Sequence, residues 1–253
     1  MSDSSSGTVG KAFRVLTAVG EHPDGATAAD VARDVGYPFS TAYRLLSTLV
    51  RENFLAYDPR DKRYRLGLRI FQLGQRASSS HGFDGMAAPV LRGLTAGTEE
   101  SSLLCVLDGD RFLTVNKVDG PQFRTTTDPG ERGLLHTSAM GKALLAFAPD
   151  DTREHLLATL ALEARTERSI TDRAALRREI DAVREQGWAG QDEEHDVGMV
   201  ALAVPVRTAA GDLVAAVALA APVFRHSMTT LLTLLPQLRD AAEELGARLP
   251  MHR

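Results

Sequence analysis

Hydroxyl and guanidinium side chains recur at helical spacing between residues 40 and 51. At about 100° per residue, one side of such a helix collects Ser40, Arg44, Ser47 and Arg51. The opposite side collects the apolar Ala42, Leu45, Leu46 and Leu49. The polar side suits hydrogen bonding to phosphates and base edges in a DNA groove, and the apolar side can pack on a small helical core. This segment therefore predicts a DNA-recognition helix.

Three candidate donors fall in the first turns of this helix, namely Ser40, Thr41 and Arg44. We interpret Arg44 as the base reader, because a guanidinium can grip guanine through two donors. Tyr43 is placed to touch a sugar or a thymine methyl group. Ser40 is either a base contact or a helix cap. Arg51 lies three turns further on, where it contacts a phosphate or faces solvent.

The elements around this helix complete a winged helix-turn-helix. Helices are expected at residues 11–20 and 28–35, the second ended by Gly36, and two strands at residues 54–57 and 63–66. The turn between the strands carries Arg60, Lys62 and Arg63, which either contact the DNA backbone or minor groove or form a solvated loop. Residues 1–9 are polar and Ser-rich and predict a disordered tail.

Charge is distributed unevenly along the 253 residues. The net charge is −4, yet residues 1–76 hold 11 Lys/Arg and 8 Asp/Glu, so this part is positive and the remainder negative. A cationic DNA-reading head on an acidic body fits that asymmetry. No apolar run approaches the roughly 18 residues that span a bilayer, and no secretory signal is expected. A single cysteine, Cys105, excludes an intramolecular disulfide, so we expect a cytoplasmic protein with no membrane partner.

The chain after the head predicts a second domain of α+β class. Residues 67–82 are expected to form a connecting helix and a hinge near 78–82, so the domains are assigned to residues 1–76 and 83–253. Strands are expected at residues 101–107, 112–118, 200–207 and 213–220, and helices at 87–96, 137–147, 150–160, 172–186 and 227–245. This order predicts a central antiparallel sheet with helices on its faces.

The start of the helix at residues 137–147 is a candidate anion site. Free backbone amides and the helix dipole favour a carboxylate there, and Thr137 and Ser138 can add hydroxyl donors next to Ala139 and Met140. The Gly141–Lys142 pair lacks the spaced glycines of a phosphate loop, so Lys142 is expected to form a salt bridge or to reach solvent.

Other candidate groups give weaker indications of chemistry. The run Asp192–Asp196 is better interpreted as a turn with exposed charges than as a metal site, because a third ligand is not evident. A side chain of this run that covers the pocket is the further alternative. His136 is interpreted as structural, with a pocket contact as the alternative, and Cys105 as a buried small apolar residue. No nucleophile–base–orienter set emerges, so we expect no enzyme activity, no metal and no cofactor.

Several motifs in a fixed order carry a resemblance to a known family. They are FSTAYRLL at 39–46, YRLGL at 64–68, LHTSAMGKAL at 135–144, GW at 187–188, DEEH at 192–195 followed by Gly198, and AVPV at 203–206. On these residues the chain resembles the IclR family of bacterial transcriptional regulators along nearly its full length. The resemblance implies a winged-helix DNA-binding domain, a connecting helix and a GAF-like domain that binds a small molecule. It also implies a homodimer or a dimer of dimers on double-stranded operator DNA, and a repressor of catabolic-type genes.

The resemblance also indicates which residues face the effector. Members that sense small keto-acids tend to have an acidic residue, a cysteine and two serines there, and the matching positions here are Gln191, Ala201, Ala218 and Ala220. All four depart from that pattern, which predicts a wider and more apolar pocket. We therefore expect an aromatic or other amphipathic carboxylate, with its acid at Ser138–Met140 and its ring against Met140, Met199 and the alanines. The alternatives are alanines that pack closely with no ligand, a small α+β enzyme fused to a DNA-binding head, and an effector-independent DNA-binding scaffold.

Overall fold

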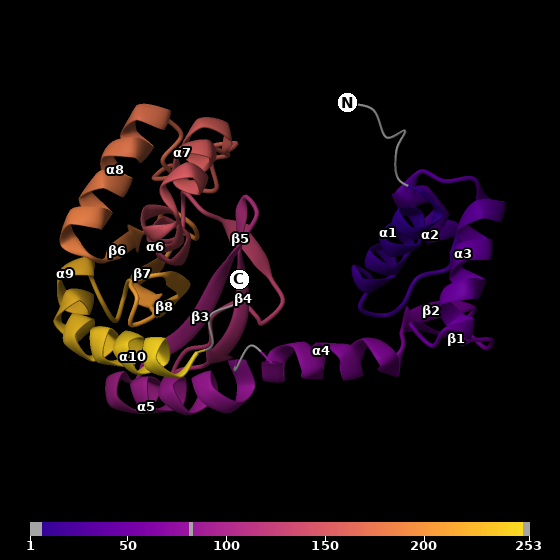
Figure 1. Cartoon of the computed structure of the whole chain (residues 1–253), viewed down its shortest axis with the longest axis horizontal. Helices are drawn as coiled ribbons and strands as arrows, with labels where there is room; N and C mark the ends of the chain where they lie inside the picture. Colours follow the sequence, from indigo (N-terminus) through magenta and orange to yellow (C-terminus); the bar gives the residue numbers. More distant parts are fainter. Residues whose placement is uncertain (1–6, 81–82, 250–253) are drawn as a thin grey trace. The chain divides into compact units, whose positions relative to one another are not determined.

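The chain forms two compact units, which were analysed in a computed structural model that describes residues 7–80 and 83–249. The first unit is Met1–Ser78 and the second is Ser79–Arg253 (Figure 1). Within the described residues, no helix combines the length and the apolar character that crossing a lipid bilayer requires.

The first unit is a winged helix-turn-helix, as predicted. Three helices, α1 (Thr8–Gly20), α2 (Ala28–Val35) and α3 (Phe39–Arg51), precede an antiparallel hairpin of β1 (Leu55–Asp58) and β2 (Arg63–Leu66). The apolar stripe of α3 is buried against α1 and α2 in one core with Val15, Val19, Val31 and Tyr64. Helix α4 (Leu68–Ser80) follows the hairpin.

Local side-chain chemistry explains where the helices of this unit begin and end. Thr27 and Asp30 form a full capping box at the start of α2, and Gly36 ends that helix in the left-handed conformation at φ +67°. Helix α1 begins at Thr8, so the prediction of a disordered tail is wrong for residues 8 and 9. The Lys11 amide donates to the Gly7 carbonyl, and this bond forms the first turn of the helix. Residues 1–6 lie outside the described residues.

The hinge prediction is also wrong for Ser78–Ser80. These residues continue α4, because serine tolerates a helix and no proline or glycine interrupts it there. The rest of the predicted hinge, residues 81–82, lies outside the described residues.

The second unit is built on a six-stranded antiparallel sheet in the order β5-β4-β3-β8-β7-β6. The strands are β3 (Ser101–Asp108), β4 (Arg111–Val118), β5 (Arg132–Leu134), β6 (Ala189–Asp192), β7 (Met199–Arg207) and β8 (Leu213–Pro222). The edge strands β5 and β6 were not predicted, because three or four residues are too short for a readable alternation of polar and apolar side chains.

Helices cover both faces of this sheet. A π-helical turn (Phe83–Ala87), α5 (Ala88–Thr98) and α10 (Leu235–Arg248) pack on one face, with Leu104, Leu202 and Val217. The other face, with Leu103, Ala203 and Ala216, packs against α6 (Ala139–Phe147), α7 (Asp150–Thr159) and α8 (Arg173–Gln186). Covering on both faces explains why β7 and β8 are nearly continuous apolar runs. The α+β prediction is therefore confirmed.

Two predicted helices of the second unit start differently or are divided in the structure, whereas the other three agree to within two residues at each end. The helix expected at 137–147 begins at Ala139, because Ser138 is extended and caps it. The helix expected at 227–245 is three segments, α9 (Met228–Leu231), a 3-10 turn (Leu232–Leu234) and α10. Pro236 lies in the first turn of α10, where its missing amide costs no hydrogen bond, so a new helix starts there.

Candidate functional site

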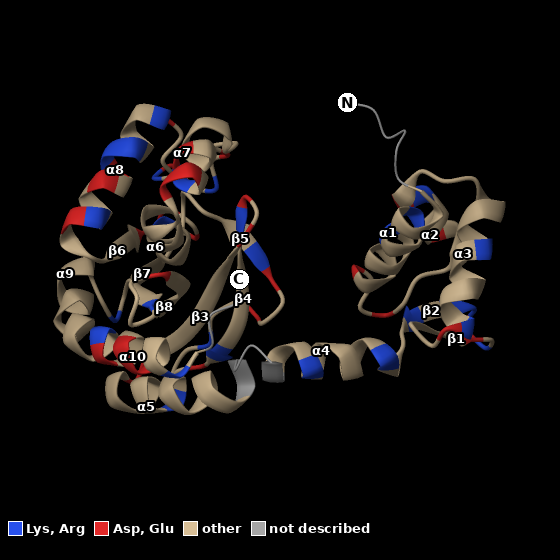
Figure 2. Ribbon diagram, in the orientation of Figure 1, with Lys and Arg blue, Asp and Glu red and all other residues tan. Residues whose placement is uncertain are grey.

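Helix α3 presents a polar face to solvent in the first unit. The buried positions are Ala42, Leu45, Leu46 and Leu49, and this burial turns Ser40, Tyr43, Arg44 and Ser47 outward. Figure 2 shows basic residues along α3 and beside the β1–β2 hairpin. Among the described residues, no hydrogen bond or ion pair engages the Arg44 guanidinium, so its donors are available to a partner.

The other predicted contacts on α3 are arranged as follows. Thr41 is half-buried, and Tyr43 stacks on Phe39 with ring centroids 6.1 Å apart. The helix cap is Pro38, without a side-chain hydrogen bond, so the interpretation of Ser40 as a cap is wrong. Ser40 is instead an exposed first-turn residue.

The wing carries fewer free cations than predicted. Arg60 and Lys62 are exposed, and Lys62 has a left-handed backbone at φ +57°. Arg63 is half-buried, and its guanidinium donates to the Gly25 carbonyl, so its assignment as a flexible wing-tip cation is wrong. The reason is that Tyr64 pairs with Ala26, which brings the start of β2 against the α1–α2 turn.

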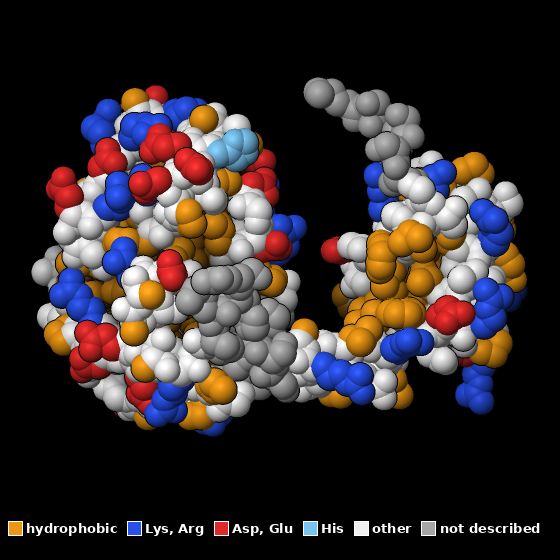
Figure 3. Space-filling view, in the orientation of Figure 1, with side chains coloured by type: hydrophobic (Ala, Val, Ile, Leu, Met, Phe, Trp, Pro, Cys, Tyr) orange, Lys and Arg blue, Asp and Glu red, His pale blue; other side chains and the backbone are white. Residues whose placement is uncertain are grey.

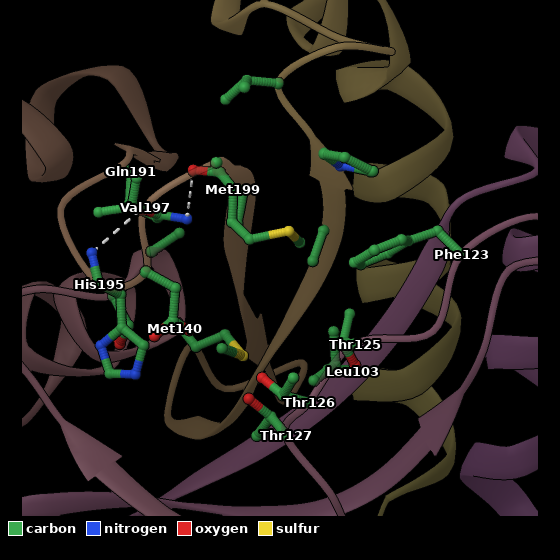
Figure 4. Close-up of a pocket in the computed structure, with 18 of the residues that line it drawn as sticks. Leu103, Phe123, Thr125, Thr126, Thr127, Met140, Gln191, His195, Val197 and Met199 are labelled. Carbon is green, nitrogen blue, oxygen red and sulfur yellow. Dashed lines mark hydrogen bonds between the residues drawn. The ribbon is translucent and has the colours of Figure 1, made fainter.

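The second unit contains a cavity of about 580 Å³ beside α6 (Figure 4). This volume is in the usual range for small-molecule sites. The lining comes from the start of α6, the strands β3, β6, β7 and β8, the β6–β7 loop, the loop from β4 to β5 and the segment after β8. Its residues are Leu103, Phe123, Thr125, Thr126, Thr127, Ser138, Ala139, Met140, Gln191, His195, Asp196, Val197, Gly198, Met199, Ala201, Ala220, Pro222, Val223 and Phe224.

Seven of the nine predicted effector residues line this cavity: Ser138, Ala139, Met140, Gln191, Met199, Ala201 and Ala220. Thr137 does not, because it is fully buried and its hydroxyl lies 2.7 Å from Nδ1 of His195. Ala218 does not either, because it is packed in the core one pleat away from Ala220. Close packing therefore describes Ala218, whereas Ala201 and Ala220 border open space.

Apart from His195 and Asp196, which belong to the run considered as a cover of the pocket, the remaining lining residues were not predicted from the sequence. The largest missed group is the segment Phe123–Thr127, which enters the cavity from the loop between β4 and β5. A run of three threonines was visible in the sequence, but β5 was not predicted, so nothing placed this loop beside the sheet. Val197 and Phe224 are exposed apolar side chains of the lining, and the sequence pattern gave no sign that they would be exposed.

Several polar side chains of the cavity are already bonded within the protein. The Ser138 hydroxyl accepts from the Gly141 amide and donates to the Leu134 carbonyl. The Gln191 amide oxygen accepts from the amides of Glu194 and His195, and its nitrogen donates to the Met199 carbonyl. Gln191 therefore holds the β6–β7 loop. The backbone amides of the first turn of α6 have no acceptor within their helix.

The run Asp192–Asp196 is a turn, as predicted, but only Asp192 is exposed, and residues 193–196 are half-buried. Glu194 is half-buried, and both its carboxylate oxygens accept from Nζ of Lys142 at 2.9 and 3.0 Å. Lys142 also donates to Glu179 at 2.8 Å, so its expected salt bridge is confirmed. Burial raises the pKa of Glu194, although Lys142 opposes that rise. His195 and Asp196 line the cavity.

Burial and hydrogen bonds within the protein determine the protonation of the histidines and the cysteine near the sheet. Burial lowers the pKa of His195, which favours its neutral imidazole, and Asp196 opposes this effect. His136 is buried, bonds the Glu163 carbonyl at 3.0 Å and does not line the cavity. Burial raises the pKa of Cys105 to about 12, so its thiol is protonated. Among the described residues, no cluster of three or more His, Cys, Asp or Glu could hold a metal ion.

A winged helix-turn-helix joined to an α+β unit with a ligand-sized cavity is the architecture of one-component regulators, which couple a small molecule to DNA binding. Comparison with known proteins specifies the family. The chain matches the family model of the IclR C-terminal domain over residues 75–247 and that of the IclR helix-turn-helix domain over residues 8–59. It therefore belongs to the IclR family, and it is a helix-turn-helix transcriptional regulator with an effector-binding C-terminal domain.

Individual relatives agree with this assignment. The chain is 32% identical to the HTH-type transcriptional regulator KdgR of Escherichia coli over 96% of its own length and 92% of that protein. A putative transcriptional regulator from Rhodococcus sp. RHA1 has a TM-score of 0.81 and 32% identity, with 94% and 96% of the two chains covered. An IclR homologue from Microbacterium hydrocarbonoxydans, solved with 4-hydroxybenzoate, has a TM-score of 0.83 and 25% identity, with 95% and 98% covered.

Proposed function

We propose that this regulator responds to an aromatic or other amphipathic carboxylate and represses catabolic-type genes in the cytoplasm. The observation that carries the proposal is the cavity beside α6. It combines an apolar wall with the amides of Ala139 and Met140 at the helix start, whereas the Gly141 amide is capped by Ser138. The acid lies at the first turn of α6, where backbone amides and the helix dipole favour an anion. The ring packs against Met140, Met199, Ala201 and Ala220.

The character of the wall favours a larger acid over a keto-acid of two or three carbons. Ala201 and Ala220 offer methyl groups, and Ser138 and Gln191 have their polar atoms bonded elsewhere. A very small acid leaves most of the cavity without contact, whereas an aromatic ring buries apolar surface worth about 25 cal/mol per Å². The Microbacterium homologue, solved with 4-hydroxybenzoate, supports the same ligand class.

Isothermal calorimetry on the full chain tests this effector class. Benzoate and its hydroxylated derivatives are expected to bind, and glyoxylate and pyruvate are expected to give no measurable heat. The reason is that only the ring fills the apolar cavity. Binding of glyoxylate or pyruvate together with no response to any benzoate contradicts the proposal.

The head binds a palindromic operator in double-stranded DNA as part of a homodimer or a dimer of dimers. Ser40, Thr41, Tyr43 and Arg44 enter the major groove, and Arg60 and Lys62 contact the backbone. Apolar side chains at the surface of the head and of α4 (Figure 3) support pairing with a second copy; they include Val9, Phe13, Leu68, Phe71 and Leu73. Effector binding favours one arrangement of the paired heads, with a typical coupling of about 1–3 kcal/mol.

Lys62→Ala is expected to weaken binding to all DNA sequences alike and to reduce the slope of log affinity against log salt by about one. The reason is that an exposed lysine on the wing neutralises one phosphate and reads no base. Fluorescence anisotropy with operator and scrambled duplexes over a series of salt concentrations measures both effects. Equal salt slopes for the variant and the wild type remove the wing from the DNA contacts.

Regulation rather than catalysis is assigned to the second unit. The Thr137 hydroxyl lies 2.7 Å from His195, but Thr137 is fully buried and does not line the cavity. The Cys105 thiol is protonated and His136 bonds a backbone carbonyl, so we assign no activated nucleophile among the described residues. Recovery of every added benzoate chemically unchanged after prolonged incubation with the protein is therefore expected. Chemical conversion of the acid would instead support the alternative function, a small α+β enzyme fused to a DNA-binding head.

A further inference from the structure

Thr125 is a lining residue of the cavity, and its hydroxyl is a buried polar group without a hydrogen-bond partner among the described residues. Thr125 is only 9% exposed. Buried hydroxyl groups in folded proteins nearly always have a partner, and leaving one unpaired costs free energy. An orphaned hydroxyl on the wall of a ligand cavity therefore points to a partner that arrives with the ligand.

Among the other polar side chains of the cavity, Thr126, Thr127 and His195 are less buried than Thr125, and the rest have their polar atoms bonded within the protein. Ser138 and Gln191 bond the backbone around them, and the Asp196 carboxylate pairs with Arg165 at 2.9 Å. Thr126 and Thr127 continue the same hydroxyl-bearing segment beside Thr125 (Figure 4). The hydroxyl groups of the lining that have no partner in the described part of the chain thus lie in the loop from β4 to β5.

This loop is held firmly against the sheet. Nζ of Lys117 donates to the Thr125 carbonyl at 3.1 Å and to the Asp128 carboxylate at 2.7 Å, and it lies 3.1 Å from Asp119. The Ser101 hydroxyl donates to the Phe123 carbonyl at 3.0 Å. These anchors fix the backbone on both sides of residue 124, so the Thr125 hydroxyl is presented in one place rather than on a mobile loop.

The position of Thr125 is remote from the expected carboxylate. In Figure 4, Met140 of the first turn of α6 is labelled on the same side of the cavity as His195, and Phe123 and Thr125 lie on the other side. A ligand whose acid binds the first turn of α6 therefore directs the far part of its ring toward Thr125. That far part is where a second polar group finds a partner.

We propose that Thr125 recognises a hydroxyl substituent on the aromatic effector, so that the regulator prefers hydroxylated aromatic acids to unsubstituted ones. This proposal rests on the aromatic carboxylate assignment above. The threonine hydroxyl both donates and accepts, so it pairs with a phenol in either sense. The ring meanwhile stays in contact with Phe123 and Leu103 at the same end of the cavity.

Calorimetric comparison of benzoate with 3- and 4-hydroxybenzoate tests the proposal. The wild type is expected to bind the better hydroxybenzoate about two- to tenfold more tightly than benzoate, the range of one net hydrogen bond. Thr125→Val keeps the shape and removes the hydroxyl, so the preference is expected to disappear. Thr125→Ser keeps the hydroxyl and is expected to retain it. An undiminished preference in Thr125→Val overturns the proposal.

Phenol and toluene separate this proposal from the assignment of a carboxylate effector, because they differ by a hydroxyl for a methyl and neither is an acid. If no benzoate binds the wild type but phenol is preferred to toluene and Thr125→Val loses that preference, the carboxylate assignment fails and the Thr125 contact stands. A cavity that takes none of these compounds overturns both.

Thermal melting without ligand gives an independent measurement. Thr125→Val is expected to melt no lower than the wild type, because it removes an unpaired buried hydroxyl. A clear drop for Thr125→Val but not for Thr125→Ser reveals a partner inside the protein and overturns the proposal.

Discussion

Replacing Arg44 with alanine is expected to weaken operator binding about 5- to 150-fold, which corresponds to about 1–3 kcal/mol. Sequence preference is expected to flatten at the base pair that Arg44 reads. Competition binding with an operator and with duplexes mutated at single positions measures both effects. Stability is expected to stay unchanged, because Arg44 is exposed and its guanidinium bonds no described residue; the carbonyl that accepts from Thr48 remains in the variant.

The size of this effect follows from the geometry of α3. Burial of Leu45 and Leu46 fixes the rotation of the helix, so Arg44 extends from its solvent face in the second turn, where recognition helices contact bases. A guanidinium gives two parallel donors to guanine O6 and N7, and alanine gives none. Loss of that pair removes affinity mainly for the correct sequence.

Arg44→Lys is the matched control for charge. Lysine keeps the positive charge but loses the planar fork, so the salt dependence is expected to remain while the sequence preference falls. If Arg44→Ala and Arg44→Lys weaken all duplexes by the same factor, Arg44 contacts phosphate and the assignment of a base contact is wrong.

Lys142→Met is expected to lower the free energy of unfolding by about 3 kcal/mol, as measured by urea denaturation at neutral pH. The Lys142 side chain is 1% exposed, and it neutralises Glu194, whose side chain is 16% exposed, together with Glu179 at 34%. Removing the cation leaves Glu194 charged and largely buried without compensation. The loss stays at the low end of the range for broken buried pairs, because Glu179 can turn toward water.

The deficit of this variant is expected to depend on pH. Burial already raises the pKa of Glu194 above 4.5, and Lys142 is the main group that opposes the rise. Without Lys142 the folded state binds the Glu194 proton more tightly than the unfolded state does. Stability therefore falls as pH rises through the window above 4.5, and the variant is closest to the wild type below that window.

Two further variants separate charge from packing at Lys142. Adding Glu194→Gln to Lys142→Met removes the unpaired carboxylate and is expected to recover part of the loss at neutral pH. Lys11→Met replaces an exposed lysine and is expected to change stability by less than about 0.5 kcal/mol. A Lys142→Met protein as stable as Lys11→Met at every pH contradicts a structural role for the buried cluster.

Much of the fold was predictable because it depends on neighbours along the chain. The 3.6-residue period of α3, the Thr27–Asp30 cap and the left-handed Gly36 are local features, and so are the apolar runs of β7 and β8. Adjacent motifs in a fixed order also indicated the family. Seven of nine predicted effector residues line the cavity, because they lie on strands and on a helix start whose directions follow from local pattern.

The features that decide ligand recognition depend instead on residues far apart in the chain. Arg63 bonds Gly25 across 38 positions, Lys142 meets Glu194 across 52, and Thr137 meets His195 across 58. No local sequence pattern shows which polar groups are hydrogen-bonded within the protein and which are left without a partner beside a cavity. The orphaned hydroxyl of Thr125 is visible only after its loop is anchored by Lys117 and Ser101, because whether a hydrogen bond forms is decided by which atoms folding brings together.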